Sequence, residues 1–422
     1  MKNEKISGFI DFCKGNEKIA VIDGKRKVSF AKFLSDCLKM KTFLRKNVAE
    51  DKKALVFIYP YSYLFYVVMF GGFMAGTDLV IIDSFKDKNL VAEMIKSAGC
   101  DYVLVDKMTK FLTFVLPKTD KIYVEKFVGC DIIASDVKIG SVTTFTSGTT
   151  GTPKPVKRSV DFLFKQEEFI QKNIDIDFSE VVFCGLPMYS ILSVYLGHTT
   201  IVSEKPDNRA TTVITSIRKV LSMRVNKNVK KCFLGGAILY RDEAAKIAET
   251  FPEAEITYVY GATESALIYK TTLDKYLKKP FSFENKVDGV FVDIENGNAG
   301  GVGEIAVSGD TVIGEGKHFT GDLGKIENGV LYVYGRKKYS DLKNGVYNYL
   351  TDDEVRSDNK NIKAAFSFMY GGKIHVVYKG KITIENPDYV YHKVKKIPYD
   401  LKHKTKLDYT KAINLISRME IR

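Results

Sequence analysis

Apolar runs alternate with stretches of helical periodicity in the first part of the chain. Between residues 54 and 106, the runs ALVFIYP, DLVIID and DYVLVD are separated by stretches at 61–75 and 90–97 whose apolar positions fit helices. Continuous apolar strands joined by helices are typical of a parallel sheet that is covered on both faces. This part of the sequence therefore predicts a βαβαβ arrangement.

The same alternation returns between residues 180 and 261. The runs EVVFCGLP, KKCFLGG and EITYVYG are predicted strands, and the intervening helices are expected around residues 214–225 and over residues 241–250. Two related βαβ sheet halves are therefore expected in one large lobe.

The pattern changes after residue 288 to short strands punctuated by glycine, GVFVDIENGNAGGVGEIAVSGDTVIG and GVLYVYGR. These runs predict a small antiparallel sheet or barrel-like subdomain. From residue 337 onward a mixed α/β alternation resumes. We therefore predict an α/β protein with a large lobe over residues 1–336, a hinge at 337–338 and a small, mobile α+β lobe over 339–422.

One stretch imitates a membrane span. Residues 54–82 carry a single charged side chain, Asp78, over a length that could cross a bilayer. Pro60, Gly71, Gly72 and Gly76 are expected to divide it into strand, helix and strand, so we expect no stable membrane insertion. Charged residues interrupt the N-terminal segment before an apolar core forms, which argues against a secretory signal and favours the cytoplasm.

Composition narrows the function classes. The 422 residues include 45% hydrophobic residues and carry a formal net charge of +13. Because the basic residues are dispersed, we expect a solvated lysine-rich surface and no nucleic-acid partner, although an acidic carrier protein would suit the charge. The six cysteines form no C-x-x-C pair, which argues against zinc and disulfides.

The segment TTFTSGTTGTPKPVKRS, residues 143–159, has the composition of a phosphate-binding loop. Gly148 and Gly151 allow backbone amides to approach an anion, and Lys154 adds a positive charge. The spacing of these glycines and the lysine is not that of a Walker loop. By itself, the segment is equally compatible with a plain surface turn.

Four more segments carry candidate chemistry. YVYGATESA places Tyr260 and Glu264 at the end of a predicted strand, HFTGDLG places Asp322 on a turn, VYGRKKYSDLKNG contains Arg336, and IPYDLKHKTKLDY contains Lys406. Each residue also has an ordinary structural interpretation: a core aromatic, a charge in a first helical turn, a turn former or a solvated cation.

In this order, the segments resemble the adenylate-forming superfamily, which includes acyl-CoA synthetases, the adenylation domains of peptide synthetases and the luciferases. The resemblance covers nearly the whole chain, and LGGAIL at residues 234–239 is similar to a glycine pair that precedes the adenine site. The phosphate loop and the Tyr-Gly-x-Thr-Glu element are specific in combination.

The resemblance implies roles for individual residues. Tyr260 would flank adenine, Asp322 would bind both ribose hydroxyls, and Arg336 would steady the ribose and phosphates. Thr263 would contact the α-phosphate, Glu264 would hold Mg²⁺, and Lys406 would be the catalytic lysine. The remaining ATP-binding positions are Thr146, Ser147, Gly148, Thr149, Thr150, Gly151, Lys154, Gly236 and Gly261.

Lys406 competes with Lys402 and Lys404 for the catalytic position, and we assign it because Leu407 and Asp408 follow it as in the family pattern. The resemblance further implies that a carboxylic acid becomes an acyl-adenylate with release of pyrophosphate and is then transferred to a thiol. The thiol would belong to coenzyme A or to the phosphopantetheine of a carrier protein. The small lobe would swing about Lys338 between the two steps.

Departures from the family pattern bear on the substrate. Ser190 stands where relatives often have histidine, and residues 191–197 contain no aspartate of the kind that grips an α-amino group. We therefore expect a fatty or aromatic acid. The small lobe is short, and its loose motif after Gly345 leaves coenzyme A recognition open. A catalytically silent nucleotide-binding subunit and a membrane-anchored protein are the alternative interpretations.

Overall fold

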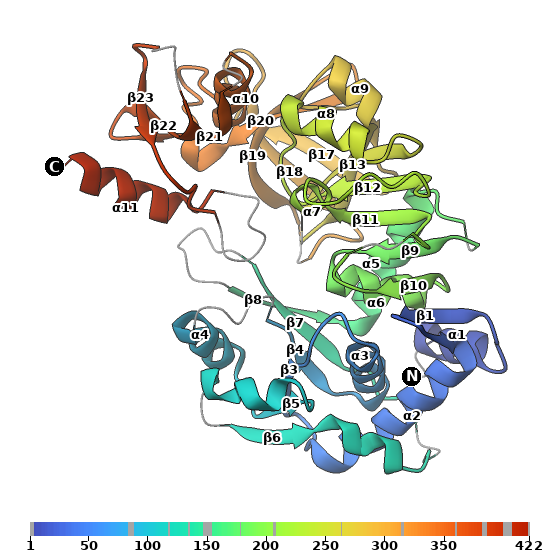
Figure 1. Cartoon of the computed structure of the whole chain (residues 1–422). Helices are drawn as coiled ribbons and strands as arrows, with labels where there is room; N and C mark the ends of the chain where they lie inside the picture. The colour runs from blue at the N-terminus through green and yellow to red at the C-terminus, as the bar shows by residue number, and fades with distance from the viewer. Residues whose placement is uncertain are drawn as a thin grey trace. The chain divides into compact units, whose positions relative to one another are not determined.

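The computed structural model describes residues 4–82, 88–116, 119–133, 136–146, 154–177, 179–205, 208–262, 264–313, 316–358, 361–381, 386–399 and 407–420. The chain divides into two compact units, Met1–Ile214 and Thr215–Arg422 (Figure 1). This boundary lies within the predicted large lobe, and the hinge predicted at residues 337–338 stays a prediction.

The first unit contains a six-stranded sheet with the strand order β6-β5-β3-β4-β7-β8. Neighbouring strands are parallel except β7 and β8, which form an antiparallel pair. The predicted βαβαβ arrangement is confirmed. Its elements are β3 Lys53–Phe57, α3 Tyr63–Ala75, β4 Asp78–Val80, α4 Lys88–Ala98, β5 Tyr102–Val105, the 3-10 helix η1 Thr109–Val115, β6 Asp120–Tyr123, the 3-10 helix η2 Val124–Gly129, β7 Ser141–Thr146 and β8 Lys154–Ser159.

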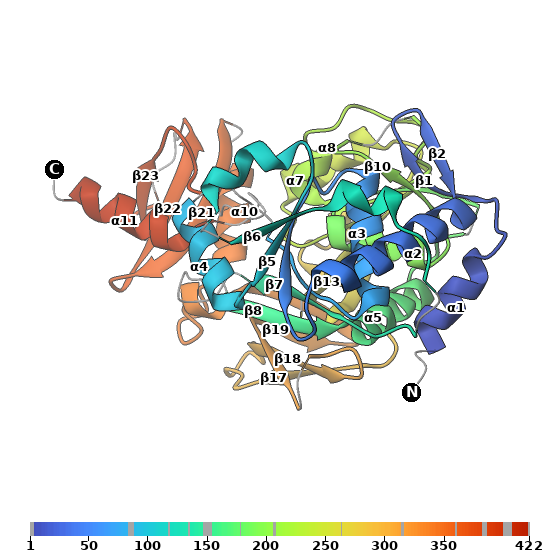
Figure 2. The same ribbon diagram turned by 90° about the horizontal axis from the view of Figure 1, so that it is seen from below.

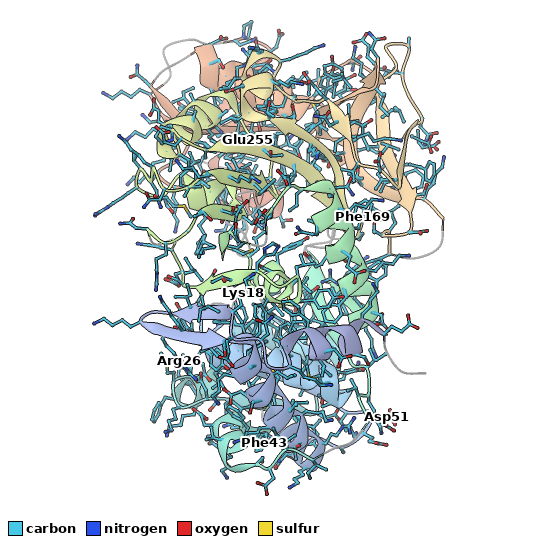
Figure 3. All side chains as sticks on the ribbon, turned by 90° about the vertical axis from the view of Figure 1, so that its right-hand side faces the viewer. Lys18, Arg26, Phe43, Asp51, Phe169 and Glu255 are labelled. Atoms are coloured by element: carbon cyan, nitrogen blue, oxygen red, sulfur yellow. The ribbon has the colours of Figure 1, made fainter. Side chains whose placement is uncertain are left out.

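The remaining strands of the first unit form a parallel set, β9, β10 and β1, extended by an antiparallel hairpin to β2. The Lys18 ammonium donates to the Gly197 carbonyl at 2.7 Å, and the Arg26 guanidinium lies 4.3 Å from the Tyr63 ring centroid. Figure 3 labels Lys18 and Arg26. The elements are α1 Glu4–Cys13, β1 Ile19–Asp23, β2 Arg26–Ser29, α2 Phe30–Asn47, α5 Val160–Asn173, β9 Val181–Cys184, α6 Pro187–Tyr195 and β10 Thr199–Val202.

The apolar stretch at residues 54–82 forms β3, α3 and β4, as predicted. Helix α3 begins after Ser62, whose side chain accepts a hydrogen bond from the Phe65 amide, and ends at Gly76, which has a left-handed φ of 81°. Within the described part of the chain, no helix has the length and apolar character needed to cross a bilayer.

Gly71 and Gly72 correct one detail of the sequence analysis, because they lie inside α3 and do not interrupt it. A Cβ added to Gly71 would lie 2.5 Å from Met40 Cγ of α2, and one added to Gly72 would lie 2.7 Å from Leu79 Cδ1. The two glycines therefore let α3 approach its neighbours closely, and α2 and α3 lie side by side in both views (Figures 1 and 2).

The second unit begins with an α/β part in which β12 and β13 are parallel and β13 and β14 form an antiparallel hairpin. The helix expected over residues 214–225 is largely wrong: Ile214 lies in β11, and the helix covers only Ile217–Val220. The β-branched run TTVIT favours a strand there, and its residues Thr212 to Ile214, which belong to the first unit, pair with β9. Strand β11 Thr212–Ser216 contains the boundary between the units, and the elements after it are α7 Ile217–Val220, β12 Lys231–Gly235, α8 Arg241–Thr250, β13 Glu255–Ala262, β14 Ala266–Thr272, α9 Leu273–Lys278 and β16 Asn285–Lys286.

A five-stranded antiparallel sheet follows, with the strand order β15-β20-β19-β18-β17, which confirms the predicted small β-rich part. The C-terminal α+β part has a three-stranded sheet with the order β21-β22-β23. The elements are β15 Ser282–Phe283, β17 Val290–Glu295, β18 Gly303–Gly309, β19 His318–Glu327, β20 Val330–Arg336, the 3-10 helix η3 Lys337–Tyr339, α10 Asn348–Asp358, β21 Ile362–Tyr370, β22 Lys373–Gly380, β23 Tyr389–Lys393 and α11 Tyr409–Glu420.

Polar contacts fasten α10 to α8 within the second unit. The Tyr240 hydroxyl donates to Asp352 Oδ2 at 2.6 Å, and the buried Arg356 guanidinium lies 2.9 Å from Asp242 Oδ1 and 3.0 Å from Glu243 Oε1. Burial raises the pKa of Asp352 to about 7. The C-terminal part is therefore held in this arrangement by desolvated charged contacts, which are costly to break.

Two helical glycines give a matched test of the packing between α2 and α3. We expect Gly71→Ala to destabilise the fold by about 1–3 kcal/mol, because the methyl group would displace Met40. Gly8→Ala in α1, with no atom within 4 Å of its added Cβ, should stabilise the fold by about 0.5–1 kcal/mol. Calorimetric melting temperatures of both variants check the prediction, and a Gly71→Ala melting temperature at or above wild type contradicts it.

Candidate active site

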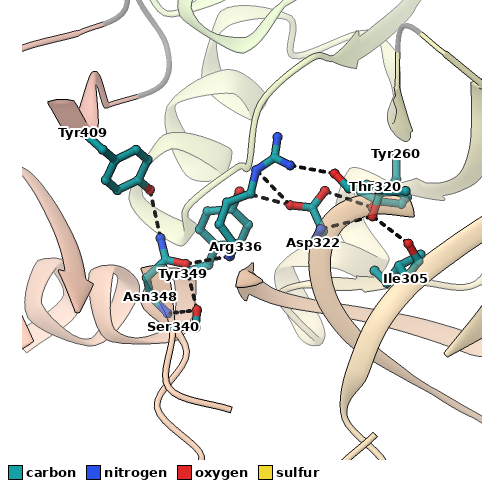
Figure 4. A network of polar contacts seen from close by, with 9 residues as sticks. All are labelled: Tyr260, Ile305, Thr320, Asp322, Arg336, Ser340, Asn348, Tyr349 and Tyr409. Carbon is teal, nitrogen blue, oxygen red and sulfur yellow. Dashed lines mark hydrogen bonds and ion pairs between the residues drawn. The ribbon is translucent and has the colours of Figure 1, made fainter. Parts of the chain in front are cut away.

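An ion pair between Asp322 and Arg336 forms the centre of the candidate site (Figure 4). The antiparallel register of β19 and β20 places the two residues opposite each other. Arg336 Nε lies 3.2 Å from Asp322 Oδ1, and Arg336 Nη1 donates to the Thr320 carbonyl at 2.8 Å. The backbone pairing of two strands therefore fixes the position of both charged groups.

Glycines next to this pair are required by its geometry. Gly321 has a φ of 75°, and a Cβ at that position would lie 3.2 Å from Arg336 Nη1. A Cβ at Gly335 would lie 2.8 Å from Asn348 Oδ1. A side chain at either position would therefore occupy space that is now filled by the ion pair or by the residues that support it.

Two tyrosines donate hydrogen bonds to Asp322. The Tyr260 hydroxyl of β13 lies 3.0 Å from Oδ2, and the Tyr349 hydroxyl of α10 lies 3.4 Å from Oδ1. Burial, and then the Asp322 charge, raises the pKa of both phenols, and the Asp322 carboxylate raises the pKa of Arg336. The tyrosines therefore remain neutral donors and Arg336 remains a cation at physiological pH.

Asn348, at the start of α10, connects the site to the C-terminal part of the chain. Its Oδ1 accepts from the Arg336 amide at 2.7 Å and from Ser340 Oγ at 3.1 Å, and its Nδ2 donates to the Tyr409 hydroxyl at 3.0 Å. Asn348, Tyr349 and Thr320 were not predicted from the sequence. Their best sequence signal was the polar and aromatic run YNY after Gly345, which matches the family pattern only loosely.

Glu264 follows Tyr260 and Gly261 in the turn of the β13–β14 hairpin, where Gly261 passes closely over the Ala266 carbonyl. Glu264 Oε2 lies 3.9 Å from His318 Nε2 of β19, the strand that also carries Asp322. The half-exposed carboxylate is thus placed by the hairpin near the same strand as the ion pair. Thr263 lies outside the described residues.

Gly236 follows the end of β12 and has a left-handed φ of 85° with open space around it. Because Leu234 pairs with Tyr258, Gly236 and Tyr260 each lie two residues further along neighbouring parallel strands. The structure therefore brings the predicted glycine to the same end of the sheet as the predicted adenine contact.

The proposed phosphate loop connects β7 to β8 in the first unit. Thr146 ends β7 and pairs with Lys154, the exposed first residue of β8. The loop is therefore closed by an antiparallel hairpin. Its candidate residues Ser147, Gly148, Thr149, Thr150 and Gly151 lie outside the described residues, as does Lys406.

Ser190 lies in α6 and is buried, and its hydroxyl contacts the Tyr66 hydroxyl of α3. The serine at the family's histidine position is therefore part of a hydrogen-bonded interior. Nearby on α5, burial raises the pKa of Glu167 to about 8, an effect that Arg158 opposes. Burial, and then Glu167, raises the pKa of Tyr189 to about 12.

Glu264 fits a Mg²⁺ ion that has few protein ligands. It does not fit a site in which protein side chains supply most of the ligands. The described residues contain no group of three or more His, Cys, Asp or Glu side chains that could hold a metal ion. Mg²⁺ commonly binds through one or two carboxylates together with substrate phosphates. A single partly exposed carboxylate is compatible with that mode of binding.

Comparison with known proteins finds a similar sequence in a curated enzyme. The D-alanine–D-alanyl carrier protein ligase of Bacillus anthracis is 24% identical over 247 residues, which is 46% of this chain and 49% of that enzyme. The chain thus matches about half the length of that relative.

Two solved structures share the fold over nearly the whole chain. The Bacillus subtilis O-succinylbenzoate coenzyme A synthetase in complex with AMP has a TM-score of 0.80 at 16% identity, covering 96% of this chain and 97% of that one. ATP-bound MatB from Rhodopseudomonas palustris has a TM-score of 0.81 at 17% identity, covering 98% and 99%.

The sequence profile of the family described as AMP-binding enzyme matches residues 13–315. That range contains the proposed phosphate loop and the candidate residues Gly236, Tyr260 and Glu264. The chain therefore belongs to the AMP-binding enzymes of the adenylate-forming superfamily.

Proposed function

We propose that this protein uses ATP to activate a carboxylic acid as an acyl-adenylate, releases pyrophosphate and transfers the acyl group to a thiol. The observation that carries the proposal is the Tyr260–Asp322–Arg336 cluster, in which one carboxylate is fixed by two strands and a partly buried phenol. Family membership and the glycine-rich loop between β7 and β8 support it.

Asp322 is suited to bind the ribose of ATP. Tyr260 occupies one position on Oδ2, while Arg336 and Tyr349 contact Oδ1. An ionised carboxylate offers about four acceptor positions, and three are used here, so binding both ribose hydroxyls requires one contact, such as the 3.4 Å hydrogen bond from Tyr349, to give way. In this proposal Tyr260 and Gly236 flank the adenine, and the Arg336 cation steadies the ribose and phosphates.

Activation brings a carboxylate to a phosphorus that is surrounded by negative oxygens. The protein must therefore neutralise charge and hold the acid in line with the leaving pyrophosphate. Residues 146–151 and Lys154 would bind the β- and γ-phosphates, Thr263 the α-phosphate and Glu264 the Mg²⁺, which screens phosphate charge when bound. Lys406 would place its ammonium where negative charge builds on the α-phosphate.

The proposed acid is fatty or aromatic. In helix α6, the apolar side chains of Ile191, Leu192 and Val194 are buried. The Ser193 hydroxyl forms a hydrogen bond with the Thr200 hydroxyl. Within 191–197, no carboxylate is available to recognise an α-amino group. The acceptor thiol would belong to coenzyme A or to an acidic carrier protein, and the similar enzymes include both synthetases and a carrier protein ligase.

We further propose that residues 339–422 form a mobile lobe that swings about Lys337 and Lys338 between the two steps. In the arrangement described here, Tyr349 contacts Asp322, and Arg356 is paired with α8. Such a movement must exchange these contacts for others of similar strength.

Pyrophosphate release from ATP, measured across a panel of fatty, aromatic and amino acids, identifies the acid. Coenzyme A and a phosphopantetheinylated carrier protein, added afterwards, identify the acceptor. Release that depends on one class of acid supports the proposal. A chain that binds ATP but releases no pyrophosphate with any acid would instead be the catalytically silent relative.

Asp322→Asn is expected to raise the KM for ATP about 10- to 100-fold, because hydrogen bonds to a charged group contribute about 1.5–3 kcal/mol. Asp293→Asn, which changes an exposed carboxylate of β17 paired with Lys317, is the matched control and should leave the KM unchanged. Steady-state pyrophosphate assays over a range of ATP concentrations make the comparison. An unchanged KM in the Asp322 variant would remove this residue from the ATP site.

Lys406→Ala is expected to slow acyl-adenylate formation by about 10²- to 10³-fold, the typical loss for one preorganised charged group. The variant should still form thioester from supplied acyl-adenylate, because the second step does not need this ammonium. Lys404→Ala is the control and should affect neither step. Equal losses in both steps, or a larger loss in the Lys404 variant, would contradict the assignment.

A further inference from the structure

The 3-10 helix η1 and the residue before it, Met108, expose four large apolar side chains. Met108 is 69% exposed, Phe111 73%, Leu112 51% and Phe114 68%. Single exposed apolar residues are ordinary on protein surfaces, but contiguous groups of them mark contact sites. We call these four residues the η1 patch.

Hydrogen bonds to buried groups hold the backbone that carries the η1 patch. Asp106 is buried, and its Oδ1 accepts hydrogen bonds from the Met108 amide at 3.0 Å and the Thr109 amide at 2.7 Å. The Thr109 hydroxyl donates to the Phe57 carbonyl of β3 at 2.6 Å. The backbone beneath the exposed side chains is therefore already ordered in the folded protein. Binding to another surface would not have to order it, which favours binding.

Apolar residues on either side of the η1 patch pack into the core, whereas the patch itself is exposed. Val105 belongs to a buried cluster with Leu55 and Phe57, and Leu116 packs against the same cluster. The fold therefore uses the apolar residues on either side of the η1 patch for its own core. The four side chains of the patch remain available to another surface.

Two lysines lie against rings of the η1 patch. Lys110 Nζ lies 4.6 Å from the Phe111 ring centroid, and Lys88 Nζ at the start of α4 lies 4.6 Å from the Phe114 ring centroid, so η1 lies beside α4 (Figure 2). Residues 107–126 include five lysines, two acidic residues and no arginine. The patch therefore combines apolar rings with a local excess of positive charge.

We propose that the η1 patch docks this protein on an anionic lipid surface. Phenylalanine, leucine and methionine would enter the boundary between headgroups and acyl chains, while the lysines contact the anionic headgroups. A protein partner fits less well, because lysine is depleted in protein–protein interfaces whereas arginine is enriched. The seven-residue η1 lies on the surface and cannot span a bilayer.

The absence of tryptophan from the chain allows a direct test. Phe114→Trp places a single fluorophore in the η1 patch. The matched control is Phe291→Trp, because Phe291 on β17 is 65% exposed and has Lys286 Nζ 5.9 Å from its ring centroid. Vesicles of phosphatidylcholine and phosphatidylglycerol at 3:1 should shift the Phe114→Trp emission to shorter wavelength and leave the control emission unchanged.

Co-sedimentation of the full chain with the same vesicles measures the binding itself. The double variant Phe111→Ala with Phe114→Ala keeps every charge and should lower partitioning at least about tenfold, whereas Phe291→Ala should not. Pure phosphatidylcholine vesicles, or 0.5 M salt, should also weaken wild-type binding. Unchanged circular dichroism and pyrophosphate release in the double variant would show that the loss is not unfolding.

Three results would overturn the proposal: no sedimentation of the wild type with anionic vesicles, equal sedimentation of the double variant, or no emission shift in Phe114→Trp. Because vesicle binding is measured without ATP or acid, this outcome is independent of the proposed ligase activity.

Discussion

The pairing of Asp322 with Arg336 across β19 and β20 is the constraint on which the candidate site depends. The register of two antiparallel strands fixes both backbones, and the neighbouring glycines, Gly321 and Gly335, leave the space in which the two side chains meet. Tyr260 from β13 and Tyr349 from α10 then converge on the same carboxylate. One charged group thus joins the α/β part, the β-rich part and the C-terminal part of the second unit, so its loss would affect each of them.

The sequence predicted the elements best where the apolar pattern was strong. The run EITYVYG and the amphipathic stretch at 241–250 became β13 and α8, and the motif residues Tyr260, Asp322 and Arg336 came together in space. The interpretation failed at two places: Ile214 belongs to a β-branched strand, and Gly71 lies within a helix, where its lack of a side chain leaves room for Met40. Asn348 and Tyr349 were missed because their roles depend on tertiary contacts that no local spacing encodes.

The C-terminal part combines firm attachment with a function that, in our proposal, requires movement. Asn348 accepts from the backbone amide of Arg336, and Arg356 is buried against two carboxylates of α8. Buried charged contacts contribute little net stability but strongly disfavour states in which one partner is left unpaired. They would therefore define a discrete arrangement of this part of the chain and not a continuum of positions, which is what a two-step reaction with distinct geometries needs.

The central claim is that a carboxylate attacks the α-phosphorus of ATP, and isotope transfer tests it most directly. A carboxylic acid labelled with ¹⁸O in its carboxyl group would be incubated with the full chain, ATP, Mg²⁺ and an acceptor thiol, and the nucleotide product would be analysed by mass spectrometry. The account predicts AMP that carries one ¹⁸O atom, because the bridging oxygen of the acyl-adenylate leaves with AMP when the thiol attacks the carbonyl carbon. Label in inorganic phosphate together with ADP, or unlabelled AMP, would contradict it.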